Sequence, residues 1–422
     1  MIIVCFGPGP QFKGGISNYN TSLAKALDNL GAEVHIVSWT QQYPAIIPRD
    51  FIDRSSKNNL LEGTNIKVTY ITNYNNPLTW NETVNYIKSL QPDKVIFQWA
   101  IALQGLPLGW MARKLLRWGK SEIIFDCHLV VQKETSSIDK SFSRYGLKKA
   151  DTYIAHAYKT VEELKETFPA KEFFVNETGE RSTGKRSTVI KLYHPIYDLF
   201  KPDANFNIEA EKKELHLKKN VFLFFGFIRK YKGLHNVIRA FKLVAEKRND
   251  VSLLIAGESF WNTMDEKKLS TKIKKKLFSF FKSLLLPSSS NEQNYRPLEL
   301  VNELKLHDSV TVVNRFIPNE EVNKYFQVSD CIVLYYETAT PSGIESISYN
   351  FELPAVATRV GHFPETIKDA FNGYLAEPEN IQSMADVMLK FLERPLPREN
   401  VSASTKQMSW ENYASAIMHS KK

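Results

Sequence analysis

Residues 221–234 read Val-Phe-Leu-Phe-Phe-Gly-Phe-Ile-Arg-Lys-Tyr-Lys-Gly-Leu. The first part, Val221–Phe225, is a short apolar run typical of a buried strand, and a glycine-bounded turn whose cations include Arg229 and Lys232 follows it. Leu234–Lys247 then has the pattern of an amphipathic helix. A strand, a turn and a helix in this order are typical of α/β domains with a parallel sheet, in which ligands bind beyond the carboxyl ends of the strands.

The same alternation extends in both directions from this stretch. Further strands are predicted at Ile2–Phe6, Glu33–Ser38, Lys67–Ile71, Lys94–Gln98, Glu122–Cys127, Thr152–Ala155, Ser252–Ala256, Ser309–Val313, Cys331–Tyr335 and Ala355–Thr358. Helices are predicted between them, among others at Ser17–Leu30, Leu108–Trp118, Asn319–Gln327 and Ile344–Asn350. The pattern predicts parallel sheets that are covered by helices on both faces.

The alternation stops between about Pro195 and Lys219, where two prolines and a charged stretch indicate a change of domain. We therefore expect an α/β protein with two Rossmann-like, doubly wound domains in tandem, at residues 1–200 and 218–406. Two such domains face each other across a central cleft, which is a common place for a ligand.

The composition is that of a globular protein, because 43% of the 422 residues are hydrophobic and disorder is thereby excluded for most of the chain. The net charge of +9 indicates an anionic partner, such as phosphate groups or an acidic lipid surface. The three cysteines lie in apolar runs without metal-like spacing and are expected to be buried thiols. We find no signal-peptide core and no uncharged run near 18 residues, so a cytoplasmic protein is expected, peripheral to the membrane at most.

A basic insertion interrupts the second domain at residues 260–295. Its lysines crowd around apolar residues that recur every three or four positions, which predicts a basic amphipathic helix. Three interpretations remain open: the helix packs on its own domain, contacts an anionic membrane surface through residues 267–286, or binds a protein partner. A nucleic acid is disfavoured because the charge is local and no recognition motif accompanies it. The membrane interpretation gains support from basic and aromatic residues of an earlier helix, namely Trp110, Arg113, Lys114, Arg117 and Trp118.

Polar residues and glycines follow the predicted strands where ligands are expected. The first strand is followed by Gly14 and Gly15, which let a ligand approach the start of a helix. His128 follows the strand Glu122–Cys127. Arg229 offers a planar fork and Lys232 a point charge for phosphate oxygens. The sequence therefore predicts an anion site in the C-terminal half, although a simple turn also explains each feature taken alone.

Two more strand ends add to this site. After Cys331–Tyr335 come Glu337, whose carboxylate suits sugar hydroxyls, and Ser342 with Gly343, whose amides suit a phosphate at a helix start. After Ala355–Thr358 come Gly361, which permits close approach, and Glu365, which also suits the first turn of the next helix.

With these residues in view, the chain resembles the glycosyltransferases of the GT-B fold, in particular the large retaining family four and a bacterial subgroup of it. The resemblance is carried by Gly14–Tyr19, Phe225–Leu234, Asp330–Glu337, Leu353–Thr358 with Gly361 and Glu365, Asp126–His128 with Glu134, and Trp410–Tyr413. In such proteins a closing helix, here at 407–422, crosses back onto the N-terminal domain.

The resemblance implies a retaining, metal-independent hexosyltransferase that takes a sugar from a nucleotide-diphosphate donor, either a UDP- or a GDP-sugar, and needs no cofactor. The acceptor would be a glycan or lipid-linked glycan, in the synthesis of a bacterial surface polysaccharide or glycolipid. The residues implied in catalysis are His128, Glu337, Arg229 and Lys232. The residues implied in donor binding are Gly14, Gly15, Ser342, Gly343, Ile344, Glu345, Gly361 and Glu365, with no metal ligand.

The pattern departs from that family at the ribose contact. The spacing from Glu337 places the second family glutamate at Glu345, whereas the spacing from Pro354 places it at Ile347. Two residues on a helix correspond to a rotation of about 200°, so both positions cannot face the same ligand. This departure motivates one alternative, a non-catalytic binding subunit of the same fold. A nucleotide-sugar epimerase on the same fold is a second alternative that stays open.

Overall fold

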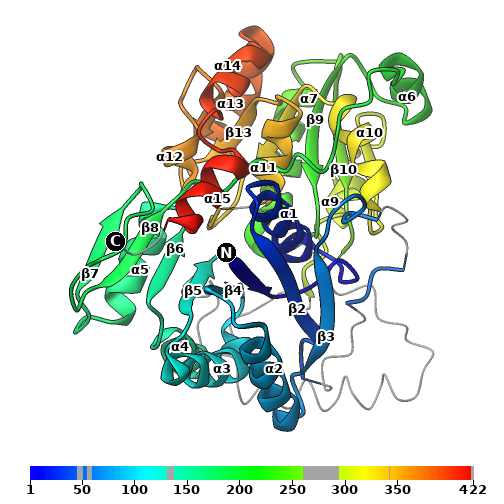
Figure 1. The fold of residues 1–422 in the computed structure, drawn as a ribbon. Coiled ribbons are helices and arrows are strands. Elements are labelled where there is room, and N and C mark those ends of the chain that lie inside the picture. Colours follow the sequence, from blue (N-terminus) through cyan, green and yellow to red (C-terminus); the bar gives the residue numbers. More distant parts are fainter. Residues whose placement is uncertain (45–50, 55–58, 131–136, 260–293, 342, 420–422) are drawn as a thin grey trace.

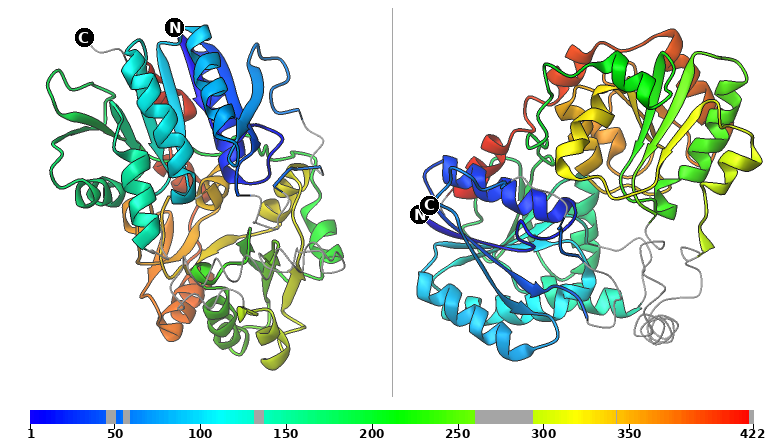
Figure 2. Two further views of the ribbon diagram at one scale, coloured as in Figure 1. Left: turned by 90° about the horizontal axis from the view of Figure 1, so that it is seen from below. Right: turned by 90° about the vertical axis from the view of Figure 1, so that its right-hand side faces the viewer.

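The computed structural model describes residues 1–44, 51–54, 59–130, 137–259, 294–341 and 343–419 (Figure 1). The two predicted sheets are present, one in each half of the chain, and the halves form two lobes in all three views (Figures 1 and 2). The predicted fold class, two Rossmann-like α/β domains, is confirmed.

The N-terminal domain is built on eight parallel strands in the order β3-β2-β1-β4-β5-β6-β8-β7. The strands are β1 (Ile2–Phe6), β2 (Glu33–Gln41), β3 (Lys67–Asn73), β4 (Lys94–Trp99), β5 (Glu122–Cys127), β6 (Thr152–Ala155), β7 (Phe173–Asn176) and β8 (Ser187–Lys191). Its helices are α1 (Gly15–Asn29), α2 (Pro77–Leu90), α3 (Gly105–Trp118), α4 (Ser137–Leu147) and α5 (Tyr158–Thr167).

Both faces of this sheet are buried, which explains why β1 is apolar at every position and why the polar residues of β4 and β5 lie at or next to the ends of these strands. In β1, Ile3 and Cys5 belong to the core beneath α1, whereas Val4 and Phe6 belong to the core beneath α2 and α3. Successive side chains of a strand point to opposite faces, so one pentapeptide contributes to two cores.

The C-terminal domain has six parallel strands in the order β11-β10-β9-β12-β13-β14. They are β9 (Asn220–Phe225), β10 (Val251–Ala256), β11 (Val310–Val313), β12 (Cys331–Leu334), β13 (Ala355–Thr358) and β14 (Gly373–Ala376). The helices are α6 (Ile208–Glu214), α7 (Leu234–Ala245), α9 (Glu299–Glu303), α10 (Val322–Gln327), α11 (Gly343–Asn350), α12 (Phe363–Thr366), α13 (Ile381–Glu393) and α14 (Arg398–Ser404).

The chain passes between the domains twice. The first passage follows β8, and the second leads from α14 to the last helix, α15 (Trp410–Met418), which lies on the N-terminal domain beside α1 (Figure 1). The two passages contact each other, because the amide of Ile196 donates to the carbonyl of Met408 at 2.9 Å. One hydrophobic cluster runs from the α1 face of the first sheet to the α10 and α11 face of the second.

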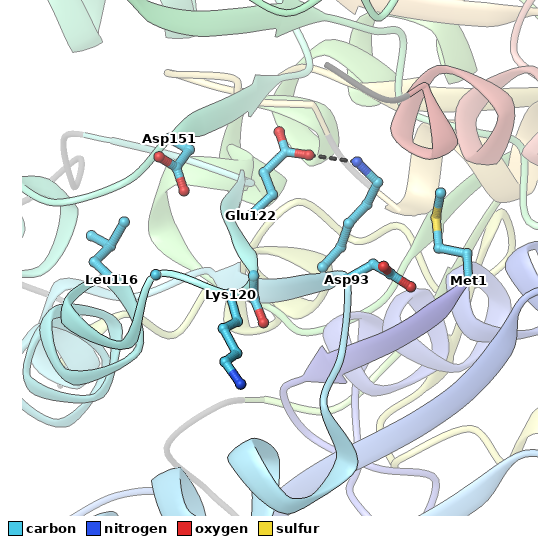
Figure 3. A pocket seen from close by; sticks show the side chains of 9 residues that line it. Met1, Asp93, Leu116, Lys120, Glu122 and Asp151 are labelled. Carbon is cyan, nitrogen blue, oxygen red and sulfur yellow. Dashed lines mark hydrogen bonds and ion pairs between the residues drawn. The ribbon is translucent and has the colours of Figure 1, made fainter. Parts of the chain in front are cut away.

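A buried charge cluster fastens α15 at the amino edge of the N-terminal sheet, the edge away from the cleft. The carboxylate of Glu122 accepts hydrogen bonds from Lys94 at 2.5 Å and from Arg181 at 2.6 Å. Arg181 also donates to the carbonyl of Ile417, and Lys94 donates to that of His419. Figure 3 shows a pocket at this edge, with the ion pair of Glu122 as a dashed line. Burial alone would raise the pKa of Glu122, but Arg181 and Lys94 lower it overall.

All the strands predicted from the sequence are present, with ends that differ by at most three residues. The strands β7, β8 and β14 were not predicted, and the predicted helix Asn319–Gln327 is a 3₁₀ turn, Asn319–Glu321, followed by α10. Of the basic insertion at 260–295, only residues 294 and 295 are described, so residues 267–286 lie outside the described residues. In the part of the chain that is described, no helix is both long and apolar enough to cross a membrane.

Candidate functional site

A cleft of about 260 Å³ opens between the carboxyl ends of the strands of the two sheets. Five predicted donor-site residues line it: Gly14, Gly15, Lys232, Gly343 and Ile344. The other lining residues come from both domains and from the first passage: Pro10, Phe12, Asn18, Asp53, Tyr197, Phe200, Phe225, Gly226, Phe227, Tyr231, Gly257, Glu258, Phe316, Ile317, Asn319, Val322 and Ile347.

Lys232 is a buried cation at this cleft. The turn that carries it is bounded by Gly226 and Gly233, which have φ angles of +91° and +65° and so favour glycine. Lys232 is 6% exposed, and among the described residues no carboxylate forms an ion pair with it. A Cβ atom on Gly226 would lie 3.1 Å from its Nζ atom, so the ammonium group rests against that glycine. Burial, and then the charge of Arg229, lower the pKa of Lys232 to about 7.

Arg229 lies on the same turn but is not among the residues that line the cleft. Its guanidinium carbon is 5.7 Å from the ring centre of Tyr231, and its charge is close enough to lower the pKa of Lys232. The turn therefore concentrates positive charge at one end of the cleft, with Lys232 closest to a ligand.

The glycine loop supplies a helix start from the N-terminal domain. Gly14 has a φ of +105°, and no atom lies within 4 Å of where its Cβ would be, so its face is open. No side chain caps the first turn of α1, which leaves its amides available to an anion. The amide of Lys13 donates to the carbonyl of Phe51 at 2.7 Å, and Asn18 reaches Asn319 of the other domain at 3.5 Å.

The start of α11 supplies the facing helix end from the C-terminal domain. Gly343 and Ile344 line the cleft, while Ser342 lies outside the described residues. A Cβ atom on Gly343 would lie 2.8 Å from Cε2 of Tyr197, so this position requires glycine as long as the tyrosine stays in place.

Glu345 does not reach the cleft, whereas Ile347 does. The carboxylate is buried, accepts hydrogen bonds from Tyr349 at 2.7 Å and from Thr366 at 2.5 Å, and pairs with His362. Burial would raise the pKa of Glu345, but His362 and these hydrogen bonds lower it overall. The structure thus separates Glu345 from the predicted donor residues, as the helical rotation between positions 345 and 347 requires.

Glu337 lies at the end of β12 and is also outside the cleft lining. Its Oε1 atom is 3.6 Å from Nε2 of His235, and its amide donates to the carbonyl of Tyr231 at 2.8 Å. The second contact ties the β12 loop to the Lys232 turn. Glu337 therefore lies beside the turn that carries Arg229 and Lys232, and its side chain is 28% exposed.

Gly361 and Glu365 frame the site and do not line it. Gly361 has a φ of +59°, and its Cβ would lie 2.0 Å from the carbonyl oxygen of Ala339, so glycine allows the β12 and β13 loops to touch. The carboxylate of Glu365 accepts a hydrogen bond from the amide of Tyr158 at 3.1 Å. That contact joins the C-terminal domain to the start of α5 in the N-terminal domain.

His128 is buried and does not line the cleft. Its ring stands edge-on to Tyr19, with the ring centres 4.5 Å apart, and its Nε2 is 2.8 Å from Oε1 of Gln98. Burial lowers the pKa of His128 to about 3, which keeps the imidazole neutral.

Two further histidines, His156 and His194, were not predicted and join His128 in one buried cluster. His156 bonds to Asp126 at 2.8 Å, and His194 bonds to Ser346 of the other domain at 2.7 Å. Each of the three histidines offers a ring nitrogen within 4.8 Å of the others, and the described residues contain no other group of side chains arranged to share a metal ion. The three rings pack edge-on, and their separate hydrogen-bond partners, Gln98, Asp126 and Ser346, come from both domains.

Several lining residues were missed, among them Tyr197 and Gly257. Gly257 directly follows β10 and could have been found by the rule that found Gly226, because both are glycines at a strand end. Tyr197 lies in the passage between the domains, where periodicity gives no signal.

Two family models match the chain, one in each half. The model of glycosyltransferase family 4 matches residues 13–175, and the model of glycosyl transferases group 1 matches residues 205–408. A comparison with curated proteins finds no match.

Solved structures with the same architecture match nearly the whole chain. Sucrose-phosphate synthase from Thermosynechococcus elongatus is 16% identical, with a TM-score of 0.63 over 98% of this chain and 96% of that one. HepE from Anabaena, in complex with UDP, is 13% identical, with a TM-score of 0.62 over 97% and 96%. The lipopolysaccharide outer core galactosyltransferase WaaB in its apo form is 14% identical, with a TM-score of 0.57 over 99% of both chains. At these identities the likeness establishes the GT-B fold alone.

Proposed function

Because the chain belongs to the glycosyltransferases of family four, whose two models match its two halves, we propose that it transfers a sugar from a nucleotide-diphosphate donor with retention at the anomeric carbon. The proposed acceptor is a glycan or a lipid-linked glycan in the synthesis of a bacterial surface polysaccharide or glycolipid. The donor is a UDP- or GDP-sugar, and the reaction needs neither a metal ion nor a cofactor.

The burial of the Lys232 side chain at the cleft is the observation that carries the proposal. A lysine that is 6% exposed and has no carboxylate partner among the described residues is costly to keep charged, unless a ligand supplies the opposite charge. The amides at the starts of α1 and α11 border the same cleft and also favour an anion. A diphosphate, which is anionic and extended, matches a cation between two helix starts.

The chemistry follows from the leaving group. As the bond between the sugar and the donor phosphate breaks, negative charge grows on the diphosphate, and groups that already point at this charge stabilise the transition state. In this proposal Lys232 and Arg229 neutralise that charge, assisted by the amides of Ser342 and Gly343. Fixed cations then take the place that a metal ion holds in other enzymes.

We assign the donor sugar to one residue beside the turn that carries Arg229 and Lys232 and to one residue of the N-terminal domain. In this proposal Glu337 accepts hydrogen bonds from donor sugar hydroxyls, and His128 contacts the sugar from the N-terminal domain. Because His128 does not line the cleft and packs against Tyr19 of α1, this contact requires a rearrangement at α1. Ile344, Gly361, Glu345 and Glu365 are proposed to support the donor through the loops they hold, with Ile344 alone of these four lining the cleft.

The similar proteins support the choice of donor and pathway. HepE was solved with UDP, and WaaB is named for galactosyl transfer to a lipopolysaccharide core. A nucleotide-sugar donor and a glycolipid acceptor are therefore chemistries that this architecture accommodates.

The first experiment is a thermal-shift screen of UDP-, GDP- and ADP-sugars, because a ligand that binds only the folded protein raises its stability. The donor found in this way is then supplied with candidate acceptors, and transfer is measured for the wild type and for Lys232→Ala. We expect Lys232→Ala to lose at least about 100-fold in kcat/KM, as expected when a group that stabilises transition-state charge is removed. Lys230→Ala, on the same turn but outside the cleft lining, is the matched control and should stay near the wild type.

A non-catalytic binding subunit is the second candidate, and the isolation of Glu345 favours it. With Ile347 at the cleft, α11 offers no carboxylate to a ribose there. Calorimetry that detects no sugar nucleotide at all, together with stable binding to a partner subunit, would decide for this candidate. A nucleotide-sugar epimerase, the remaining alternative, would release an epimerised sugar without any acceptor.

A peripheral contact with the cytoplasmic face of the membrane is a further part of the proposal. Residues 267–286, which are predicted to make this contact, lie outside the described residues. The structural support therefore comes from α3, the other helix predicted to contribute. Trp110, Lys114 and Arg117 share one side of α3, and the ammonium of Lys114 is 5.2 Å from the ring centre of Trp110. Arg113 is held inside by the carbonyls of Gly109 and Tyr145 and does not contribute. Flotation with anionic vesicles at low salt tests this contact, and no binding there would remove it.

A further inference from the structure

Tyr197 contacts both helix starts that border the cleft. It belongs to the first passage between the domains and is 2% exposed. Its hydroxyl group donates a hydrogen bond to the carbonyl of Gly15, at the first residue of α1, with a distance of 2.7 Å. Its ring lies against Gly343, at the first residue of α11, where a Cβ atom would lie 2.8 Å from Cε2. One side chain thus lies between the glycine loop of one domain and the helix start of the other.

The position of Tyr197 is itself fixed by its neighbours. Its amide donates to the carbonyl of Ser346 at 3.4 Å, which links the passage to α11. Its ring centre is 5.5 Å from that of His194, and the ring of His194 in turn bonds to Ser346. The ring of Trp410, on α15, stands 6.4 Å from that of Tyr197. Buried aromatic side chains with such contacts have few rotamers available, so Tyr197 can act as a rigid spacer.

We propose that Tyr197 is a positioning residue that sets the separation of the α1 and α11 starts, so that both address the same donor diphosphate. The inference rests on the proposed function, because it assumes that the two helix starts share one ligand. A helix start binds an anion through its first backbone amides, and this attraction declines within the first turn. The distance between the two helix starts therefore decides whether both contribute to binding the same anion. The absence of a side chain at position 343 lets the ring lie against α11, whereas a Cβ at position 15 would still be 3.8 Å from the hydroxyl oxygen of Tyr197.

The hydroxyl and the ring make separate contacts that two substitutions can separate. Tyr197→Phe removes only the hydrogen bond to Gly15 and leaves the ring on Gly343. We expect kcat/KM for the donor to fall about 3- to 10-fold, the factor that corresponds to one neutral hydrogen bond. Tyr193→Phe is the matched control, because it makes the same change in the same passage at a residue with no hydrogen bond to the glycine loop.

The ring contact is tested by a double-mutant cycle. Gly343→Ala places its Cβ against the ring and should reduce donor affinity, whereas Gly343→Ala in a Tyr197→Val background should recover part of that loss. Additive effects of the two substitutions would overturn the assignment of the ring contact.

A distance measurement separates this inference from the proposed function. The three native cysteines are buried, so spin labels can be attached to Glu82→Cys and Glu303→Cys, which are exposed positions of the two domains. Pulsed electron paramagnetic resonance without any donor should give a broader or shifted distance distribution for Tyr197→Phe than for the wild type and Tyr193→Phe. If Tyr197→Phe leaves this distribution unchanged, the inference is wrong, whether or not the protein transfers sugar. If the distribution changes and no donor binds the wild type, Tyr197 does set the separation of the helix starts, but the proposed function fails and with it the shared diphosphate.

Discussion

The carboxylate of Glu345 and the imidazole of His362 form an ion pair inside the C-terminal domain, both side chains being at most 5% exposed. The pair joins α11 to the loop that follows β13, two elements whose other residues border or frame the cleft. A glutamate that a sequence pattern would assign to a ligand is therefore used to hold two loops together.

Breaking this pair should destabilise the protein strongly. Glu345→Gln leaves His362 without its buried partner, and removal of one member of a buried pair typically costs about 3–5 kcal/mol. Urea unfolding measures this cost, with Glu399→Gln as a control at an exposed glutamate of the same domain. The pKa of Glu345 is lowered in the folded state, so its contribution is present at neutral pH and is lost as the pH falls through that lowered value. A wild-type stability for Glu345→Gln would contradict the structural role.

Donor affinity should depend on pH through Lys232. The free protein holds this lysine with a pKa of about 7, so its charged fraction falls as the pH rises from 6 to 8. An anionic ligand favours the charged form, and its affinity should therefore decrease across this range, approaching about tenfold per pH unit above the pKa. Calorimetric titration with UDP at several pH values measures the effect. Lys232→Arg stays charged throughout and should flatten the profile; an unchanged slope in that variant would show that another group titrates.

Gly361 should tolerate no side chain. Gly361→Ala introduces a Cβ that would lie 2.0 Å from the carbonyl oxygen of Ala339, in a backbone with φ of +59°. We expect a loss of about 2–4 kcal/mol in the free energy of unfolding, which adds a steric clash to the strain of a positive φ. Gly63→Ala is the matched control, since its φ is +77° but no atom lies within 4 Å, and it should cost about 1 kcal/mol. Equal losses in the two variants would mean that the contact with Ala339 is unimportant.

The charge cluster at Glu122 should hold α15 in place. Glu122→Gln leaves Lys94 and Arg181, both buried, without their shared carboxylate, and about 3–5 kcal/mol of stability should be lost. Hydrogen exchange should accelerate in α15 more than in α7 of the other domain. Glu33→Gln, at a glutamate whose side chain is 61% exposed, is the control and should change little. Uniform acceleration in both helices would show that Glu122 supports the protein globally and not α15 in particular.

The sequence predicts the fold and part of the site for a clear physical reason. Strands buried on both faces are largely apolar, so β1, β5 and β9 are visible as short runs, and Lys232 is found by its place after β9. The strand β7 is only half-buried and lies at the edge of its sheet, which weakens the same signal.

The contacts between distant segments could not be predicted. That His128 turns back to Gln98, and that Tyr197 reaches Gly15, depends on rotamers that the packing of both domains selects. The helix that carries Glu345 and Ile347 shows an intermediate case. The helical period predicts that only one of Glu345 and Ile347 faces the cleft, but it does not predict which one.

The docking of α15 has a consequence for how the chain folds as it is synthesised. Trp410 and Tyr413 complete the packing around Tyr19, yet these partners are separated by nearly the whole of the sequence. The N-terminal domain leaves the ribosome first but lacks α15 until the end of synthesis. The sheet of the C-terminal domain, which ends at Ala376, can be completed earlier. During that interval Tyr19 lacks its contacts with Trp410 and Tyr413, and we expect chaperones that recognise apolar surfaces to bind at this side of α1.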